Sequence, residues 1–226
     1  MELTILMPCL NEEKTIKTCI DKAQNFLQKN NIDGEVLIAD NGSSDKSIEI
    51  IKNTKARLIN VSEKGYGNAI INGIKESKGK YIIMCDSDDS YDLDNLMPFL
   101  QKLRENNDLV MGNRYAYIEK GAMSLSHYLG VKFLTALGNI IYKTNLNDYH
   151  CGLRGFNKEK ISKLKLECIG MDFASEIIVK CKKSNYKIVE IPTKLFKDGR
   201  GHKSHLNTIR DGIRHVKCLI KYIKKV

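Results

Sequence analysis

The sequence predicts an α/β fold with a mostly parallel central sheet flanked by helices. Across residues 1–113, short apolar runs alternate with longer amphipathic stretches, which is the pattern of β-α-β units. The 226 residues suffice for one large domain with a substantial core. A hydrophobic fraction of 42% and a charged fraction of 28% are ordinary for a soluble globular protein, which excludes a disordered or collagen-like chain.

The elements of the first half follow from the spacing of apolar residues. Helical stretches are expected near residues 12–29, 44–54, 67–77 and 94–106, the last with Asp94 as its cap and Pro98 in its first turn. Ligands of parallel sheets bind beyond the carboxyl ends of the strands, so the loops there should carry the chemistry. The expected strands are residues 3–7, 35–39, 57–61, 81–85 and 109–112.

The second half is organised differently and ends in a basic helical subregion. We expect a largely buried helix at residues 124–143, with contact to lipid as the alternative. A turn-rich segment, a helix, a strand and a polar basic loop follow at residues 148–156, 171–182, 186–192 and 196–205, before an amphipathic helix at residues 206–226. Without a repeat or a linker, residues 1–226 are predicted to form a single domain with halves 1–113 and 114–226.

The net charge of +10 is confined to the second half. Residues 1–113 hold 14 Lys and Arg against 18 Asp and Glu, whereas residues 114–226 hold 23 against 9. A protein that wraps nucleic acid would not usually keep its N-terminal half acidic, so nucleic acid is not the expected partner.

Cysteine spacing and the N-terminus favour the cytoplasm. The seven Cys include no C-x-x-C pair and no metal-like spacing with His, which is typical of reduced thiols. The N-terminus lacks a signal peptide, and no run of about 18 apolar residues could span a bilayer. We therefore expect a chain that is not integral to a membrane, although it can still lie on one.

The acidic segment Asp86-Ser87-Asp88-Asp89-Ser90-Tyr91-Asp92 directly follows the fourth apolar run. Carboxylates held this closely repel one another, and a divalent cation is the usual reason to place them at a strand end. Oxygen ligands favour Mg²⁺ or Mn²⁺ bridging a nucleotide diphosphate. The alternative is a solvated acidic turn. A calcium loop of the EF-hand type fits poorly, because Tyr91 and Met97 replace its Gly and Glu.

Three other strand ends carry polar residues. Asp40 ends the second strand and precedes Asn41-Gly42-Ser43-Ser44-Asp45, whose side chains could simply cap the next helix. Glu12, after the first strand, is either a first-turn carboxylate or a ligand group. Gly65-Tyr66-Gly67 follows the third strand and matches only half of a dinucleotide fingerprint.

The strand-end segments described above, in their order along the chain, resemble those of family 2 glycosyltransferases of the GT-A fold. The second half resembles the polyprenyl-phosphate branch, which includes dolichyl-phosphate mannose and glucose synthases. Two departures are Ser90, where some members place a Gln metal ligand, and the absence of the transmembrane helices that follow this domain in many members. The similar segments are residues 7–13, 40–45, 64–69, 86–88, 112–115, 148–156, 173–176 and 198–204.

The resemblance implies a metal-dependent, inverting transfer of a sugar from a nucleotide diphosphate sugar to a polyprenyl phosphate. A UDP-sugar such as UDP-glucose is favoured over GDP-mannose. Asp86 and Asp88 would hold Mg²⁺ or Mn²⁺. The roles implied for the other residues are nucleotide binding by Pro8, Glu12, Asp40, Lys64 and Asp86, catalysis by Asp88, Asp148 and Arg154, and acceptor phosphate binding by Arg114, Arg154, Arg200 and Lys203.

The acceptor class decides the role of Asp148. A phosphate monoester is already largely dianionic at neutral pH and needs no general base, whereas a hydroxyl acceptor would use Asp148 as one. Otherwise Asp148 is a turn-forming residue that orders Arg154. Glu176 is expected to be the structural partner of a nearby Arg. The alternatives to lipid phosphate are a saccharide or protein hydroxyl acceptor, or a non-catalytic module that binds an anionic surface or nucleic acid.

A lipid phosphate acceptor would place the protein on the cytoplasmic face of an anionic membrane. Each Lys or Arg near such a surface contributes about 1 kcal/mol. Residues 206–226 then form either an interfacial anchor or a helix that packs on its own domain. A separate membrane protein or a second copy of the chain is a further expected partner.

Overall fold

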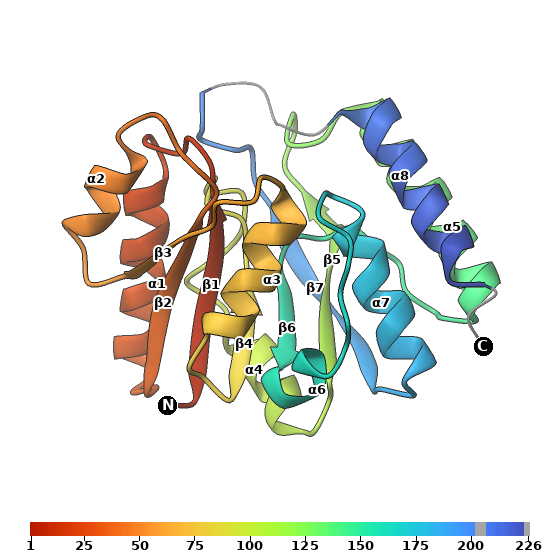
Figure 1. Cartoon of the computed structure of the whole chain (residues 1–226), viewed down its shortest axis with the longest axis horizontal. Coiled ribbons are helices and arrows are strands. Elements are labelled where there is room, and N and C mark those ends of the chain that lie inside the picture. The colour runs from red at the N-terminus through yellow and green to blue at the C-terminus, as the bar shows by residue number, and fades with distance from the viewer. Residues whose placement is uncertain (202–206, 224–226) are drawn as a thin grey trace.

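The computed structural model, which describes residues 1–201 and 207–223, is built around one seven-stranded sheet (Figure 1). The strand order is β3-β2-β1-β4-β6-β5-β7, and every neighbouring pair is parallel except those made by β6. The predicted α/β class with a mostly parallel sheet is confirmed. The strands are β1 (Leu3–Cys9), β2 (Gly34–Asp40), β3 (Arg57–Asn60), β4 (Tyr81–Met84), β5 (Leu109–Ile118), β6 (Arg154–Asn157) and β7 (Ile188–Leu195).

Helices cover both faces of the sheet. One face packs against α1 (Ile16–Lys29), α2 (Ser47–Lys52) and α4 (Met97–Arg104). The other packs against α3 (Tyr66–Glu76), α6 (Lys158–Ser162) and α7 (Phe173–Lys183). The remaining two, α5 (Leu125–Tyr142) and α8 (Thr208–Lys221), pack on each other and on α7 at one side of the molecule (Figure 1).

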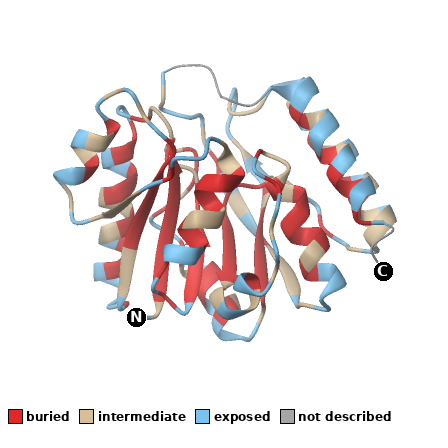
Figure 2. Cartoon of the chain, viewed as in Figure 1, coloured by how far each residue is buried: buried red, intermediate tan, exposed pale blue. Residues whose placement is uncertain are grey.

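The first strand shows why the apolar runs become central strands. All seven residues of β1 are buried, and successive side chains point to opposite faces of the sheet. Leu3, Ile5 and Met7 join the core under α1 and α4, while Leu6 joins the core under α3. Figure 2 shows that the central strands are buried along most of their length. Burial on both faces explains the uninterrupted apolar run. Each such side chain contributes about 1.5–3 kcal/mol when it leaves water.

Strand β6 was not predicted. It lies within the turn-rich segment 148–156 and extends past it, and it inserts antiparallel between β4 and β5, pairing Phe156 with Ile82 and Gly155 with Val110. Four residues that include Arg154 and a Gly carry no alternating apolar signal, so only tertiary pairing defines the strand. It places Arg154 opposite Met84, at the carboxyl end of β4.

The expectation that residues 124–143 are largely buried is wrong for one side of α5. Leu125, Leu129, Phe133 and Ile140 are 58–77% exposed, because the packing of α5 on α7 and α8 leaves these side chains uncovered. No helix in residues 1–201 and 207–223 is long and apolar enough to cross a bilayer.

Helix α8 packs in an unexpected orientation. Its buried side includes Asp211, His215 and Cys218, whereas Ile209 and Ile213 on its apolar stripe are 77% and 52% exposed. Polar contacts, rather than the apolar stripe alone, hold α8 against the domain. One side of the helix therefore packs on its own domain, as one alternative predicted, and the interfacial anchor stays a prediction.

Two helix starts differ from prediction. Helix α4 begins at Met97, after Leu96 as the cap, and Asp94 makes no capping bond; Pro98 does lie in the first turn. Helix α1 begins at Ile16 because residue 11 adopts a left-handed conformation and residues 12–15 form a turn that lies over the site.

Candidate active site

A pocket of about 940 Å³ opens at the carboxyl ends of β1 and β4, between the strand-end loops and helices α5 and α8. Asp40 and Asp148 do not line it themselves but adjoin the lining residues Asn41 and Arg114, and Lys203 lies outside the described residues. The predicted site residues that line it are Pro8, Glu12, Lys64, Asp86, Asp88, Arg114, Arg154 and Arg200.

Asp88 is held in place by Ser90. The Ser90 backbone N–H and Oγ both donate to Asp88 Oδ1, at 3.0 and 2.6 Å, in a buried setting. The other carboxylate oxygen, Oδ2, faces the pocket side and accepts from Arg200. Ser90, where some relatives were expected to carry a Gln ligand, therefore orients the neighbouring carboxylate.

Asp86 lies between Tyr66 and Gly152. The Tyr66 hydroxyl donates to Asp86 Oδ1 at 2.8 Å, and burial together with the nearby carboxylate raises the pKa of Tyr66 well above its usual range, so it remains a donor. A Cβ on Gly152 would lie 2.2 Å from Asp86 Oδ2, so only Gly leaves room for this carboxylate. The sequence placed Tyr66 in a strand-end motif without giving it a role.

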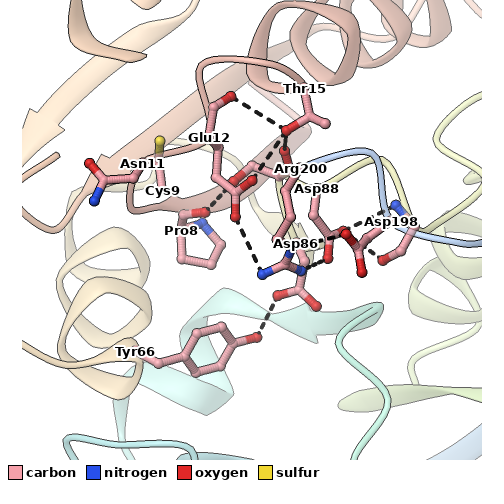
Figure 3. A network of polar contacts seen from close by, with 12 residues as sticks. Pro8, Cys9, Asn11, Glu12, Thr15, Tyr66, Asp86, Asp88, Asp198 and Arg200 are labelled. Carbon is pink, nitrogen blue, oxygen red and sulfur yellow. Dashed lines mark hydrogen bonds and ion pairs between the residues drawn. The ribbon is translucent and has the colours of Figure 1, made fainter. Parts of the chain in front are cut away.

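The first loop and the acidic segment are tied together (Figure 3). Thr15 Oγ1 donates to the Ser87 carbonyl and Ser87 Oγ donates to the Pro8 carbonyl, both at 2.7 Å. These bonds join β1 to the end of β4 and fix the spacing between Glu12 and Asp88 across the site.

Arg200 reaches into this acidic cluster (Figure 3). Its guanidinium bonds to Asp88 and lies 3.5 Å from both Glu12 Oε1 and Asp198 Oδ1. The chain segment around it is anchored because the Gly199 N–H donates to the Asp88 carbonyl at 2.9 Å. A cationic group thus already sits on the carboxylate predicted to hold a metal.

The donor set fits a divalent cation that is shared with a ligand. Asp86 and Asp88 supply two carboxylates, and no group of three or more His, Cys, Asp or Glu suited to a metal occurs in the described part of the chain. Mg²⁺ typically takes one or two carboxylates and completes its shell with substrate phosphates and water. A guanidinium already drawn to Asp88 indicates that this position favours positive charge.

Asp40 has one engaged and one unpartnered oxygen. Its Oδ2 accepts from the backbone N–H groups of Gly42 and Ser43 at 2.9 and 3.1 Å. Its Oδ1 is buried and has no partner among the described residues. A buried acceptor without a donor is costly, so this atom suits an N–H supplied by a ligand. Lys64 Nζ donates to the Asn41 carbonyl at 2.9 Å beside it.

Asp148 pairs with Arg114. Arg114 Nε and an Nη donate to its two oxygens at 2.7 and 2.9 Å in a buried ion pair, and Asp148 also accepts from the His150 N–H. Burial raises the pKa of Asp148, but the charge and bonds of Arg114 outweigh it and leave that pKa below its ordinary value. Asp148 forms the expected turn through the His150 N–H, but the arginine that it pairs with is Arg114 and not Arg154.

Arg154 is buried without an ion pair to any described residue. Its three guanidinium nitrogens donate to the carbonyls of Cys151, Ala174 and Tyr149 at 2.7–3.0 Å. Burial lowers the pKa of Arg154, yet an arginine remains protonated. The wall of the pocket therefore holds a fixed positive charge without a carboxylate partner, which favours an anion.

A chain of polar side chains, of which His150 and His215 line the pocket, was missed by sequence reasoning. His150 Nε2 lies 3.2 Å from Ser175 Oγ, which lies 2.9 Å from His215 Nδ1. Burial lowers the pKa of His150 well below its ordinary value and that of His215 to about 4, so both are neutral near pH 7. The three residues come from a loop, α7 and α8, so no local pattern relates them.

Glu176 is structural, as expected, but its partner is a lysine. It accepts from Tyr222 Oη at 2.6 Å and from the Cys168 N–H at 2.8 Å, and it forms an ion pair with Lys180 at 2.8 Å. These bonds fix the loop before α7 against the end of α8.

Comparison with known proteins identifies the family. A family model described as glycosyl transferase family 2 matches residues 4–165. The chain belongs to this family. It is 34% identical over 221 residues to a low-salt glycan biosynthesis hexosyltransferase of Haloferax volcanii, covering 96% of this chain and 53% of that protein. It is 25% identical over 241 residues to a dolichol-phosphate mannosyltransferase of Pyrococcus furiosus, covering 98% and 64%. This family 2 chain thus spans about half to two thirds of these relatives.

A solved structure shares the fold. The glucosyl-3-phosphoglycerate synthase of Mycobacterium tuberculosis, in complex with Mn²⁺, UDP and phosphoglyceric acid, superposes with a TM-score of 0.75 at 17% identity, covering 99% of this chain and 78% of that one. The GT-A fold predicted for this family 2 member is confirmed.

Proposed function

We propose that this protein transfers a sugar from a nucleotide diphosphate sugar to a polyprenyl phosphate, with inversion, at the cytoplasmic face of a membrane. One observation carries the proposal. A single pocket joins carboxylates suited to a cation, Arg154 without a carboxylate partner among the described residues, and an apolar wall from α5 and α8. In this scheme residues 1–113 hold the donor and residues 114–226 hold the acceptor.

The donor side suits a metal-bound diphosphate. Asp86 and Asp88 would hold Mg²⁺ or Mn²⁺, which neutralises the diphosphate leaving group when bound. The buried Oδ1 of Asp40 can accept an N–H from a nucleobase, and Pro8, Glu12 and Lys64 are the expected remaining nucleotide contacts. The UDP and Mn²⁺ of the solved neighbour support a UDP-sugar as donor.

The acceptor side suits a phosphate. Arg154 supplies positive charge from the pocket wall, and Arg114 lies beside it in its pair with Asp148. A guanidinium binds phosphate oxygens well, and a phosphate dianion needs no base to attack C1 of the sugar. Asp148 is a poor base because its pKa is lowered and Arg114 engages both oxygens. The named activity of the Pyrococcus relative supports a polyprenyl phosphate acceptor.

The exposed apolar residues of α5 and α8, some of which also line the open side of the pocket, suit a lipid surface. Phe133 and Leu129 on α5, with Ile209 and Ile213 on α8, are more than half exposed. Arg210 and Arg214 beside these isoleucines are 59% and 47% exposed, although both also lie near Asp211. Apolar residues flanked by basic ones are typical of a helix that lies in an anionic membrane interface.

A panel of nucleotides tests the donor half of the proposal. Bound ligand raises stability in proportion to its affinity, so Tm should rise most with UDP plus Mn²⁺ and less with GDP or CDP. The Asp88→Asn variant should lose the Mn²⁺-dependent part of the shift. If none of the three nucleotides raises Tm in the presence of Mn²⁺, the proposed donor site is refuted.

A further inference from the structure

Main-chain hydrogen bonds position Arg200 at the acidic cluster. The Phe196 N–H donates to the Ser90 carbonyl and the Gly199 N–H donates to the Asp88 carbonyl, both at 2.9 Å. These bonds dock residues 196–199 along the acidic segment independently of charge. The backbone next to Arg200 is therefore held close to Asp88. The Arg200 side chain is only 13% exposed.

Arg200 binds Asp88 Oδ2, the carboxylate oxygen that would otherwise be available to coordinate a cation. Ser90 already engages Asp88 Oδ1 through two hydrogen bonds, which leaves Oδ2 as the oxygen directed at the site. The guanidinium bonds to this Oδ2 and lies 3.5 Å from Glu12. A carboxylate oxygen held by a guanidinium is not available as the same ligand to a metal ion.

We infer that Arg200 is an internal counter-ion that makes the divalent cation and the nucleotide diphosphate bind cooperatively at this site. The inference rests on the proposed donor site and deepens it. A cation arriving alone must break the Arg200–Asp88 pair and leave a largely buried guanidinium without that partner, which is costly. A diphosphate arriving alone meets Glu12, Asp86 and Asp88 with only part of their charge compensated.

Joint binding removes both penalties. Asp88 exchanges the guanidinium for the metal ion, and Arg200 exchanges a carboxylate for phosphate oxygens, with which it forms equally strong charge-assisted bonds. Neither Asp88 nor Arg200 is then left without an opposite charge. Two ligands that each improve the other's affinity show a reciprocal coupling, commonly about 5–150-fold.

Lys22 provides a matched control from the same acidic segment. It pairs with Asp89 at 2.7 Å, so it is also a cation bound next to the metal motif. Asp89 is directed toward α1, and neither Lys22 nor Asp89 lines the pocket. A purely general electrostatic effect would appear on removal of either positive charge, whereas competition for Asp88 would appear only at Arg200.

The experiment measures Mn²⁺ binding directly, from the signal of free Mn²⁺ in electron paramagnetic resonance, with and without UDP. For the wild type we expect weak Mn²⁺ binding that UDP strengthens by roughly tenfold or more. Arg200→Gln should bind Mn²⁺ alone several-fold more tightly than the wild type and show a smaller gain from UDP, since direct contact between the ion and the diphosphate still contributes. Arg200→Lys keeps the charge but not the planar guanidinium, so its Mn²⁺ affinity and its gain from UDP should lie between those of the wild type and Arg200→Gln.

Three outcomes decide the inference. It is overturned if Arg200→Gln leaves Mn²⁺ affinity without UDP unchanged or weaker, or if Lys22→Gln produces the same gain. It is supported if the coupling falls only in the Arg200 variants while their Tm stays near that of the wild type. If no form binds Mn²⁺ in a manner that Asp88→Asn abolishes, the proposed donor site itself fails, and the inference fails with it.

Discussion

Asp88 illustrates how much of the site depends on one supporting side chain. Ser90 donates to Asp88 Oδ1 through its hydroxyl at 2.6 Å. A hydrogen bond to a charged group contributes about 1.5–3 kcal/mol, so we expect Ser90→Ala to weaken the apparent Mn²⁺ affinity about tenfold or more. The Mn²⁺ dependence of transfer measures this effect. An unchanged Mn²⁺ dependence would show that the backbone bond alone orients Asp88.

Gly152 offers a steric test of Asp86. An alanine Cβ at this position would lie 2.2 Å from Asp86 Oδ2, so Gly152→Ala must displace the carboxylate. Misplacement of about 1 Å in a site can cost roughly 100-fold in rate, and we expect a loss of that order in kcat/KM. The control is Gly130→Ala on α5, where an added Cβ meets nothing within 4 Å. Equal activity of the two variants would exclude a role for the position of Asp86.

The buried pair of Asp148 and Arg114 has a predictable dependence on pH. Breaking such a pair costs about 3–5 kcal/mol, so Asp148→Asn should lower the free energy of unfolding by about that amount at pH 7. The folded-state pKa of Asp148 lies below its ordinary value of 3.8, so the stabilisation is present above that value and is lost as pH falls through the folded-state pKa.

Urea unfolding of wild type and Asp148→Asn across pH 2–7 measures this difference, at roughly one-unit pH steps. The two curves should converge only below about pH 4. A constant difference down to the lowest pH would contradict the assignment of the stabilisation to the charged carboxylate.

Single site residues could be predicted from the sequence where they directly follow an apolar strand. Asp86 and Asp88 follow an apolar run, so their place at the sheet edge followed from the sequence. The partner of Asp148 could not be predicted from the sequence. Arg114 is 34 residues away, and the pair forms only when β5 packs beside the loop that carries Asp148. Tyr66 and His215 were missed for the same reason, since their contacts join separate elements.

At the scale of elements, α5 and α8 form one side of the molecule and carry many of its exposed apolar residues. The sequence predicted an amphipathic α8 and left its orientation open. Ile209 and Ile213 are exposed and line the open side of the pocket, whereas Asp211 and His215 are buried against the domain. Local periodicity could not settle this, because the partner of His215 is Ser175 on α7.

This orientation predicts where lipid binds. The double substitution Ile209→Ser with Ile213→Ser removes two exposed apolar side chains, each worth up to about 1.5–3 kcal/mol when buried. Sedimentation with anionic vesicles should show binding reduced by roughly tenfold or more. Ile169→Ser, at a 56% exposed position outside both helices, is the matched control. A similar loss in the control, or no loss in the double variant, would contradict a lipid-facing α8.

At the scale of the molecule, the charge separation noted in the sequence corresponds to two sides of one pocket. The acidic half supplies Glu12, Asp86 and Asp88, and the basic half supplies Arg154 and Arg200, which meet where the strands end. Strand β6 is the element that brings the halves together, because it carries Arg154 between β4 and β5. The sequence predicted the two charges but not this strand.

The most direct test of the account is transfer itself. Purified protein with Mn²⁺ and radiolabelled UDP-glucose is offered a short polyprenyl phosphate or the same polyprenol without phosphate, and the lipid product is measured. We expect label on the phosphate acceptor alone, lost in Asp88→Asn and sharply reduced in Arg154→Lys. Equal transfer to the alcohol, or no transfer from UDP-glucose, GDP-mannose or any other nucleotide sugar to the phosphate, would contradict the central claim.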